Sequence, residues 1–229
     1  MTIAENIARI RANMAAAARE AGRDPKEILL VGASKMNDAA ACREAVAAGI
    51  DALGENRVQE MVQKLEQHAY DGAPLHFIGH LQRNKVKQVV GHVALIQSVG
   101  SLELLDEIEK VAAARDLVQD ILLEVNIAGE ASKGGCTPEE VQGLVQLAQA
   151  LGHVRVRGLM AIPPIAAAPG ANRPYFSAMR QLFVDIRGKM SDNQYDMDCL
   201  SMGMSADFED AIAEGATLVR VGTAIFGPR

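Results

Sequence analysis

The sequence lacks the features that mark nucleic-acid-binding and secreted proteins. Its 23 Lys and Arg residues are outnumbered by 29 Asp and Glu residues, so the formal net charge is -6 and no basic excess is available for phosphate backbones. The three cysteines, Cys42, Cys136 and Cys199, are widely spaced, form no CxxC motif and cannot all pair with one another. We therefore expect a cytoplasmic protein whose partners are small molecules or proteins rather than nucleic acid.

Long apolar segments are also missing. Charged residues between Glu5 and Glu20 interrupt the apolar core that a signal peptide needs. The smoothest apolar stretch, AIPPIAAAPG at 161–170, contains three prolines and is too short for a bilayer core about 30 Å thick. We therefore expect no export signal and no contact with a membrane.

The chain does contain a regular alternation of short apolar runs and helical segments. The helical segments carry start signals such as Thr137-Pro138-Glu139-Glu140, a capping box with proline at the first helical position. Eight strand-helix units in 229 residues favour an α/β fold, a single (β/α)8 TIM barrel over residues 1–229 with no linker and no second β domain. The apolar runs expected to form strands are 28–34, 51–55, 75–80, 94–99, 121–127, 154–162, 199–204 and 218–226.

An additional amphipathic helix is predicted at about 2–21, because Ile3, Ile7, Ile10 and Met14 recur at helical spacing. The last apolar run ends close to the last residue of the sequence, so we expect no eighth helix after it and expect the N-terminal helix to cover the gap. A doubly wound sheet is the alternative topology. The absence of a G-x-G-x-x-G motif after the first strand weakens its dinucleotide-binding version.

Lys35 closes the first apolar run, ILLVGAS. Active-site groups of such barrels lie at the carboxyl ends of the strands, and Lys35 shares its strand parity with Val31 and Ala33. If these residues face the barrel interior, Lys35 is partly desolvated, which favours the neutral amine that attacks carbonyl carbon. Schiff-base chemistry is one interpretation; a lysine that extends from the strand end to water is the other.

Two motifs of small residues, SMGMS at 201–205 and VGT at 221–223, follow the last two strands. Barrels often bind phosphate at this position. Small residues let backbone N–H groups approach an anion, and the hydroxyls of Ser201, Ser205 and Thr223 can add donors. The motifs therefore predict a phosphate site, with glycines that merely permit tight turns as the alternative.

Arg220 is expected to face the barrel interior, because Val219 and Val221 beside it should face the helices. A buried guanidinium stays charged and needs acceptors, for which Glu124 and Asn126 on the fifth strand are candidates. A structural salt bridge inside the barrel is the alternative to a ligand contact.

A lysine for an aldehyde, a cradle for phosphate and an inward arginine together describe a site for one compact phosphorylated aldehyde. Pyridoxal 5'-phosphate (PLP) satisfies all three requirements. A guanidinium that faces the pyridine nitrogen disfavours its protonation and weakens the ring as an electron sink.

In order and combination, these motifs resemble the pyridoxal phosphate homeostasis protein family, which is related in fold to the N-terminal barrel of alanine racemase. The resemblance covers nearly the whole chain and implies a fold-type III PLP barrel. After the lysine, this chain has Met36-Asn37-Asp38 where many members have threonine and Lys-Pro. The matching runs are GASK (32–35), GENRVQE (54–60), HFIGHLQRNK (76–85), RGLMAIP (157–163), LSMGMSADFEDAIAEGAT (200–217) and VRVGTAIFG (219–227).

The resemblance also implies a role for each site residue. PLP would form a covalent aldimine, a Schiff base, on Lys35, with Asn56 beside the ring, Met160 packed near it and Arg220 facing the pyridine nitrogen. His80, Asn84 and Lys85 lie in a shared run without an assigned role. The residues that would bind or border the phosphate are Ser201, Gly203, Met204, Ser205, Gly222 and Thr223.

A catalytic function would need a second acid/base group. Racemisation requires such groups on both faces of the cofactor, and in the racemase relatives the second is a tyrosine from another domain of a partner subunit. No such domain is expected up to Arg229, and Tyr70, Tyr175 and Tyr195 lie outside the strand ends. We therefore expect no catalytic residue and no metal site.

The expected function is that of a monomeric PLP-binding protein that buffers or delivers the cofactor in vitamin B6 homeostasis, with PLP-dependent apoenzymes as candidate partners. One alternative is a fold-type III enzyme such as an amino-acid racemase with an unrecognised second base. Another is a lysine-dependent aldolase that acts on sugar phosphates.

Overall fold

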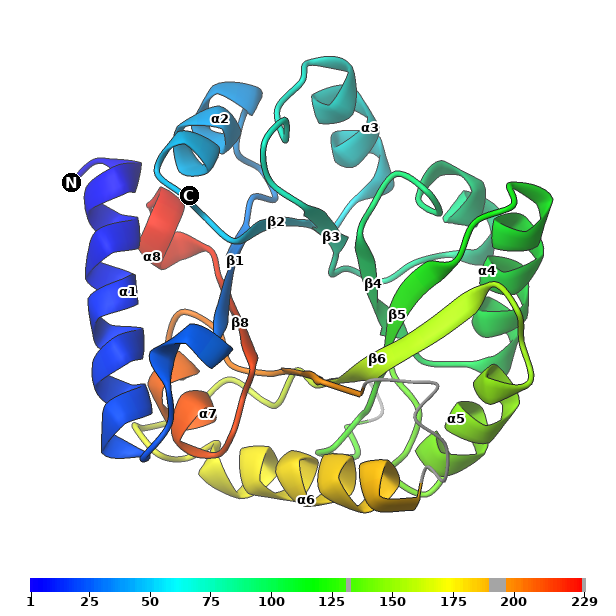
Figure 1. Ribbon diagram of the computed structural model, residues 1–229. Helices are drawn as coiled ribbons and strands as arrows, with labels where there is room; N and C mark the ends of the chain where they lie inside the picture. The colour runs from blue at the N-terminus through cyan, green and yellow to red at the C-terminus, as the bar shows by residue number, and fades with distance from the viewer. Residues whose placement is uncertain (131–132, 190–196, 228–229) are drawn as a thin grey trace.

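Eight parallel strands form a closed barrel in chain order in a computed structural model, which describes residues 1–130, 133–189 and 197–227 (Figure 1). The last strand closes the barrel against the first, with Leu30 opposite Val219. The predicted (β/α)8 barrel is confirmed and the doubly wound sheet is excluded. The strands are β1 (Leu29–Ala33), β2 (Ala52–Glu55), β3 (Leu75–Phe77), β4 (Leu95–Val99), β5 (Gln119–Glu124), β6 (Val154–Met160), β7 (Cys199–Ser201) and β8 (Leu218–Val221).

The helices surround the barrel (Figure 1). Side chains alternate along each strand, so that Leu30 and Val219 join the large core beneath the helices, whereas Val31 and Leu218 join a smaller cluster inside the barrel. Short 3-10 helices lie at Pro25–Glu27 and Arg83–Gln88. The α-helices are α1 (Ile3–Glu20), α2 (Ala39–Ala47), α3 (Val58–Glu66), α4 (Leu102–Ala114), α5 (Val141–Gln149), α6 (Arg173–Lys189), α7 (Phe208–Ala213) and α8 (Thr223–Phe226). Within the described ranges, no helix combines the length and the apolar character needed to cross a membrane.

The N-terminal helix α1 forms close to the predicted range and buries Ile7, Ile10 and Met14. The expectation that no helix follows the last strand is wrong, because the four-residue helix α8 begins at Thr223. The apolar residues after Val221 turn back under α1, where Asn6 Nδ2 donates to the carbonyl oxygen of Ile225 at 2.8 Å. Helices α1 and α8 therefore cover this side of the barrel together (Figure 1).

The predicted capping box before α5 forms. The amide of Thr137 donates to Glu140 Oε2 at 2.9 Å, and the amide of Glu140 donates to Thr137 Oγ1 at 3.3 Å. Residues 138–140 form a turn, so the regular helix begins only at Val141.

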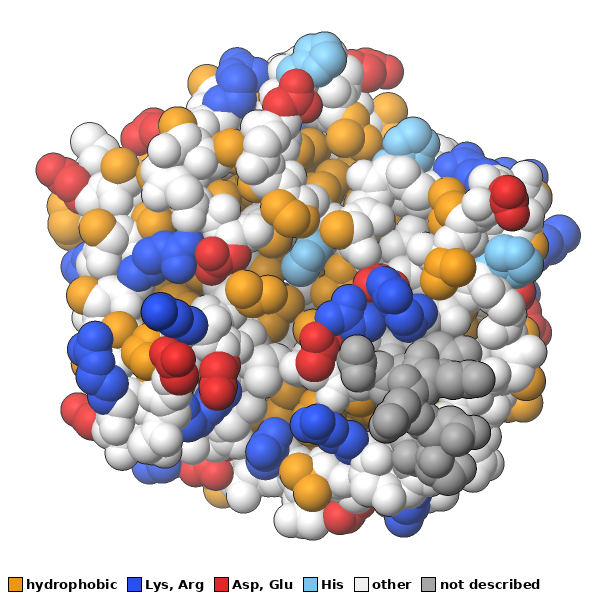
Figure 2. Space-filling view, viewed as in Figure 1, with side chains coloured by type: hydrophobic (Ala, Val, Ile, Leu, Met, Phe, Trp, Pro, Cys, Tyr) orange, Lys and Arg blue, Asp and Glu red, His pale blue; other side chains and the backbone are white. Residues whose placement is uncertain are grey.

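Paired charges connect the amino-terminal ends of β5, β6 and β7. Arg155 donates to both carboxylate oxygens of Asp120, at 2.6 and 2.8 Å. Arg157 donates to Asp120 at 2.9 Å and to Asp198 at 2.6 and 3.0 Å. On the face of the molecule shown in Figure 2, basic and acidic side chains are likewise interspersed rather than gathered in a patch of one sign.

Candidate functional site

A cavity of about 390 Å³ opens at the carboxyl ends of the strands. It brings together most of the predicted site residues, although these come from segments far apart in the sequence. Met160, Ser201 and Gly203 do not line it. The residues that do are Ala33, Lys35, Asn56, Ile78, Ile162, Pro164, Ile165, Ala166, Met204, Ser205, Ala206, Asp207, Arg220, Gly222 and Thr223.

Lys35 lies two residues after the end of β1 and is half-buried in the cavity wall. The strand parity expected from the sequence holds, since Val31 packs inside the barrel and Ala33 lines the cavity. Met36, the residue after Lys35, has a left-handed backbone with a φ of 62°. Asp38 caps α2 by accepting the amide of Ala41 at 2.8 Å, so the Met36-Asn37-Asp38 segment ends in a helix start.

Arg220 faces the interior and is only 4% exposed. Its guanidinium donates to Ser201 Oγ and, at 2.8 Å, to the carbonyl oxygen of Ala161. Glu124 and Asn126, the acceptors expected for Arg220, do not accept from it. No carboxylate of the described residues lies within ion-pair distance of Arg220. The side-chain amide of Asn126 bonds the backbone of Glu130 instead. The structural salt bridge considered for Arg220 is therefore absent from the described part of the chain.

The charge of Arg220 is retained at neutral pH. Burial lowers the pKa of its guanidinium to about 10, while the negative charges of Glu124 and Asp207 oppose that shift. A pKa near 10 leaves the group protonated at pH 7. The cavity therefore contains a permanent positive charge whose hydrogen bonds go to neutral oxygen atoms.

Ser201 lies beneath the cavity and is fully buried. Its hydroxyl accepts from Arg220 and donates to Gln97 Oε1 at 2.7 Å, and Gln97 Nε2 contacts His76 Nδ1 at 3.0 Å. Burial lowers the pKa of His76 to about 4, so the ring is neutral and can accept from Gln97. This hydrogen-bonded chain crosses the barrel interior from β8 to β3.

Met160 and Gly203 also contribute from behind the cavity wall. Met160 is fully buried in the cluster that fills the barrel. Gly203 has a φ of 90°, and a Cβ atom there would lie 2.5 Å from the Cβ atom of Ala211. Because Gly203 has no side chain, the backbone can turn tightly against α7. At this position the motif therefore fits the alternative to a phosphate site, a glycine that permits a tight turn.

The two small-residue motifs meet at the cavity. Ser205 Oγ accepts the amide of Gly222 at 3.2 Å and so joins the loops after β7 and β8. Gly222 and Thr223 line the cavity beside them, and a Cβ atom at Gly222 would lie 3.4 Å from Ala33. Ser205, Gly222 and Thr223 therefore line the same part of the cavity, and the Ser205 hydroxyl keeps its own proton to donate to an anion.

The segment between β6 and α6 forms a further wall that the sequence did not reveal. Asn172 Nδ2 donates to the carbonyl oxygen of Pro164 at 3.0 Å and to Asp207 Oδ2 at 2.7 Å. Asp207 Oδ1 in turn accepts the amide of Met204 at 2.7 Å. Asn172 thereby fastens this segment to the loop that carries Ser205. In the sequence, the only sign of these contacts is an asparagine that follows a Pro- and Gly-rich stretch.

The residues present fit a compact anionic ligand with an apolar ring. Arg220 supplies positive charge and Lys35 supplies an amine, while Ile78 and Ile162 supply apolar surface. The Oδ1 atom of Asn56 is buried and has no partner among the described residues, so it can accept a hydrogen bond from a ligand. The volume is within the range of about 300–1,000 Å³ that small-molecule sites occupy.

A second cavity, of about 480 Å³, adjoins the first and shares Asn56, Ile78 and Ile162 with it. His80 and Glu124 line this second cavity. Burial raises the pKa of Glu124, although the charge of Arg220 opposes the shift. Asn84 and Lys85, from the same shared run as His80, lie in the 3-10 helix Arg83–Gln88 and do not line either cavity.

Neither Tyr70 nor Tyr175 lines the described cavity wall. The hydroxyl of Tyr70 is buried and donates to Glu55 Oε1 at 3.0 Å, and Tyr175 lies on α6. Tyr195 lies outside the described residues. Within the described ranges, no three His, Cys, Asp or Glu side chains are grouped as metal ligands.

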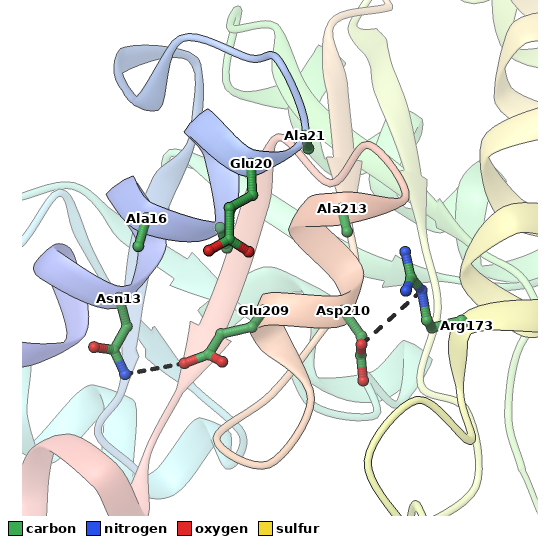
Figure 3. A pocket seen from close by; sticks show the side chains of 9 residues that line it. Asn13, Ala16, Glu20, Ala21, Arg173, Glu209, Asp210 and Ala213 are labelled. Atoms are coloured by element: carbon green, nitrogen blue, oxygen red, sulfur yellow. Dashed lines mark hydrogen bonds and ion pairs between the residues drawn. The ribbon is translucent and has the colours of Figure 1, made fainter.

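A larger cavity, of about 670 Å³, lies at the outer surface between α1 and α7 (Figure 3). Its polar groups are largely paired: Asn13 donates to Glu209 at 2.9 Å, and Arg173 contacts Glu214 at 3.0 Å and Asp210 at 4.0 Å. Acidic side chains and alanines make up most of its wall. Such a wall repels a phosphate group, so this cavity is not a candidate for an anionic ligand.

A family model and the curated relatives that match this chain point to the same group of proteins. A family model described as alanine racemase, N-terminal domain, matches residues 6–229. The chain is 42% identical over 228 residues to the pyridoxal phosphate homeostasis protein of Pseudomonas aeruginosa, covering 100% of this chain and 96% of that protein. It is 43% identical over 229 residues to the protein of the same name from Aquifex aeolicus, covering 100% and 99%.

Solved structures agree with these relatives. The structure of PipY from Synechococcus elongatus with PLP bound has a TM-score of 0.85 and 32% identity, and the match covers 99% of this chain and 100% of PipY. An alanine racemase from Streptomyces lavendulae has a TM-score of 0.74 and 21% identity over 96% of this chain and 57% of the racemase. The second likeness shows a shared barrel and no more.

Proposed function

The chain belongs to the pyridoxal phosphate homeostasis protein family, and we propose that it binds PLP in the cavity that contains Lys35 and takes part in intracellular PLP homeostasis. The observation that carries this proposal is that Lys35, Arg220, Ser205 and Thr223 line one cavity of suitable volume. The likeness to PipY, whose structure is described with PLP bound, supports it.

Each cavity residue has a proposed role. PLP, when bound, supplies an aldehyde carbon that an amine can attack, and Lys35 is the residue that would hold it as a Schiff base. The residues proposed to bind the cofactor with Lys35 are Asn56, Met204, Ser205, Arg220, Gly222 and Thr223, with Met160, Ser201 and Gly203 supporting them from behind.

The phosphate would lie beside Ser205, Gly222 and Thr223, since hydroxyl and backbone groups gather there. Asn56 can accept a hydrogen bond from the ligand through its buried Oδ1 atom. Arg220 would face the pyridine nitrogen, to which a guanidinium donates but from which it takes no proton. The ring then stays a weak electron sink.

We infer that the protein is not an enzyme. The described cavity wall contains no tyrosine, and Asp207, a second titratable group beside Lys35 in this wall, already accepts hydrogen bonds from Met204 and Asn172. The relatives are named homeostasis proteins rather than enzymes, which agrees. The same proposal includes a cytoplasmic, monomeric, single-domain protein that buffers PLP or delivers it to apoenzymes.

Absorbance titration tests the proposal. PLP added to the purified protein should produce the Schiff-base band, and Lys35→Ala should abolish it because no other lysine lines the described cavity wall. Lys26→Ala, an exposed lysine near β1, is the matched control and should leave the band unchanged. A band of wild-type size in Lys35→Ala would refute the assignment.

Solvent deuterium exchange at the α-carbon of a panel of amino acids tests the absence of catalysis. We expect exchange no faster than that caused by free PLP, because Asp207, the carboxylate in the described cavity wall, already accepts hydrogen bonds from Met204 and Asn172. Sustained exchange above that background would favour the racemase.

A further inference from the structure

Both peptide groups next to Lys35 are held by side chains of one turn of α3. Lys64 Nζ donates to the carbonyl oxygen of Ser34 at 2.9 Å. Glu60 Oε2 accepts the amide of Met36 at 2.8 Å. Glu60 and Lys64 are four residues apart, so they lie on the same face of the helix, with Nζ and Oε2 at 3.9 Å.

A buried carboxylate completes this arrangement. Glu55, at the end of β2, is fully buried, and its Oε1 atom accepts from Lys64 Nζ at 2.5 Å and from Ser34 Oγ at 2.6 Å. Tyr70 is the third donor to the same atom, and burial raises the pKa of its hydroxyl, which keeps the proton in place. Lys64 is itself only 6% exposed.

The geometry at Met36 shows why the backbone needs support here. A positive φ is unfavourable for a residue with a side chain, and it occurs immediately after the proposed cofactor lysine. The bond from the Met36 amide to Glu60 holds this conformation. Asn37 adds a local bond from Nδ2 to the carbonyl oxygen of Lys35 at 3.1 Å.

We propose that Glu55, Glu60 and Lys64 form a clamp that fixes the direction of Lys35 by holding the peptide groups on both of its sides. These three are positioning residues, because none of them lines the cavity. A buried ion pair is not required for a stable core, since apolar residues of similar volume serve as well. The inference rests on the proposed function only in taking Lys35 as the residue that holds PLP.

Amide hydrogen exchange in the protein without PLP tests the clamp directly. Glu60→Ala should speed exchange of the Met36 amide by at least about tenfold, the usual effect of losing a hydrogen bond to a charged group. Glu60→Gln keeps an acceptor and should restore most of the protection. Glu66→Ala removes an exposed carboxylate from the same helix and should have no effect.

The same variants, loaded with PLP, report on Lys35 itself. Glu60→Ala should release PLP about tenfold faster and shift the pH at which the Schiff-base absorbance changes, whereas Glu60→Gln should resemble the wild type. The Glu60 side chain is only 22% exposed and bonds the Met36 amide, so Glu60→Ala should also lower the unfolding temperature without PLP; the pH profile is the readout that distinguishes the clamp. A merely structural residue would change the unfolding temperature and leave the pH profile in place.

A double variant, Glu55→Gln with Lys64→Met, removes both buried charges at once and leaves neither unpaired. It should also release PLP faster than the wild type. Unchanged Met36 exchange and unchanged PLP release in Glu60→Ala would overturn the clamp, whether or not the double variant folds. If wild-type protein forms no adduct on Lys35, the proposed function fails, while Met36 exchange still decides the clamp.

Discussion

At the scale of single residues, Arg220 shows how the barrel holds a charge at its centre. Its hydrogen bonds go to Ser201 Oγ and the carbonyl oxygen of Ala161 rather than to a carboxylate. No ion pair therefore neutralises the positive charge, and the carboxylates of Glu124 and Asp207 only oppose the lowering of its pKa by burial. A guanidinium in this state suits the proposed contact with a pyridine nitrogen better than one neutralised in an ion pair.

Ser201→Ala should destabilise the protein, because it leaves the buried guanidinium with one acceptor fewer and Gln97 without a donor. We expect the free energy of unfolding to fall by about 1–3 kcal/mol. Urea unfolding measures this, and Ser177→Ala on the exposed face of α6 is the control. An unchanged unfolding midpoint for Ser201→Ala would contradict the role assigned to this hydroxyl.

His76 should make stability depend on pH. Its pKa is about 4 when folded and close to 6.5 when unfolded, so the unfolded chain binds more protons between these values. The free energy of unfolding therefore has its full value above about pH 6.5 and decreases by roughly 3 kcal/mol as the pH falls toward 4. His76→Gln should flatten this part of the curve, whereas His92→Gln, which changes an exposed ring, should not. Equal slopes in wild type and His76→Gln would refute the prediction.

At the scale of elements, the segment between β6 and α6 is the wall that can control access to the cavity. Asn172 ties it to Asp207 and to the backbone at Pro164. The backbone of β6 is itself constrained, because a Cβ atom at Gly158 would lie 1.7 Å from the carbonyl oxygen of Cys199. The wall therefore follows a closely packed strand, and near its far end it is held by the Asn172 side chain and by the Gly170 amide, which donates to Asp210 Oδ2 at 2.9 Å.

Asn172→Ala should loosen this wall without removing any cavity residue. We expect PLP to dissociate about tenfold faster, which corresponds to the loss of roughly one charge-assisted hydrogen bond. Stopped-flow absorbance of the Schiff-base band measures the rate. Asn13→Ala, which removes an amide bonded to Glu209 on the opposite side of α7, is the control. A dissociation rate equal to that of the wild type would show that the wall does not depend on Asn172.

Much of this element-level organisation could be predicted from the sequence, because apolar runs and capping signals are local. The helix α8 could not, since a short apolar run such as 223–226 fits a strand as well as a helix. Lys35 and Arg220 follow from strand parity. The partners of Arg220 and the contact between Glu55 and Lys64 do not, because they depend on which side chains meet after the barrel has closed.

At the scale of the whole molecule, the two ends of the barrel differ. Paired charges among Asp120, Arg155, Arg157 and Asp198 connect strands at the amino-terminal end, where barrels are stabilised. The carboxyl end opens into the cavity that contains Lys35. Stability and ligand binding therefore reside at opposite ends of one fold, so changes at the charged end should leave PLP binding intact in folded protein.

The proposed function depends on one covalent bond in this barrel. Reduction of the PLP-loaded protein with borohydride, followed by peptide mapping by mass spectrometry, locates that bond. The prediction is a single reduced pyridoxyl-phosphate adduct, on Lys35 alone. An adduct mapped to a different lysine, or no adduct in protein that binds PLP, would contradict it.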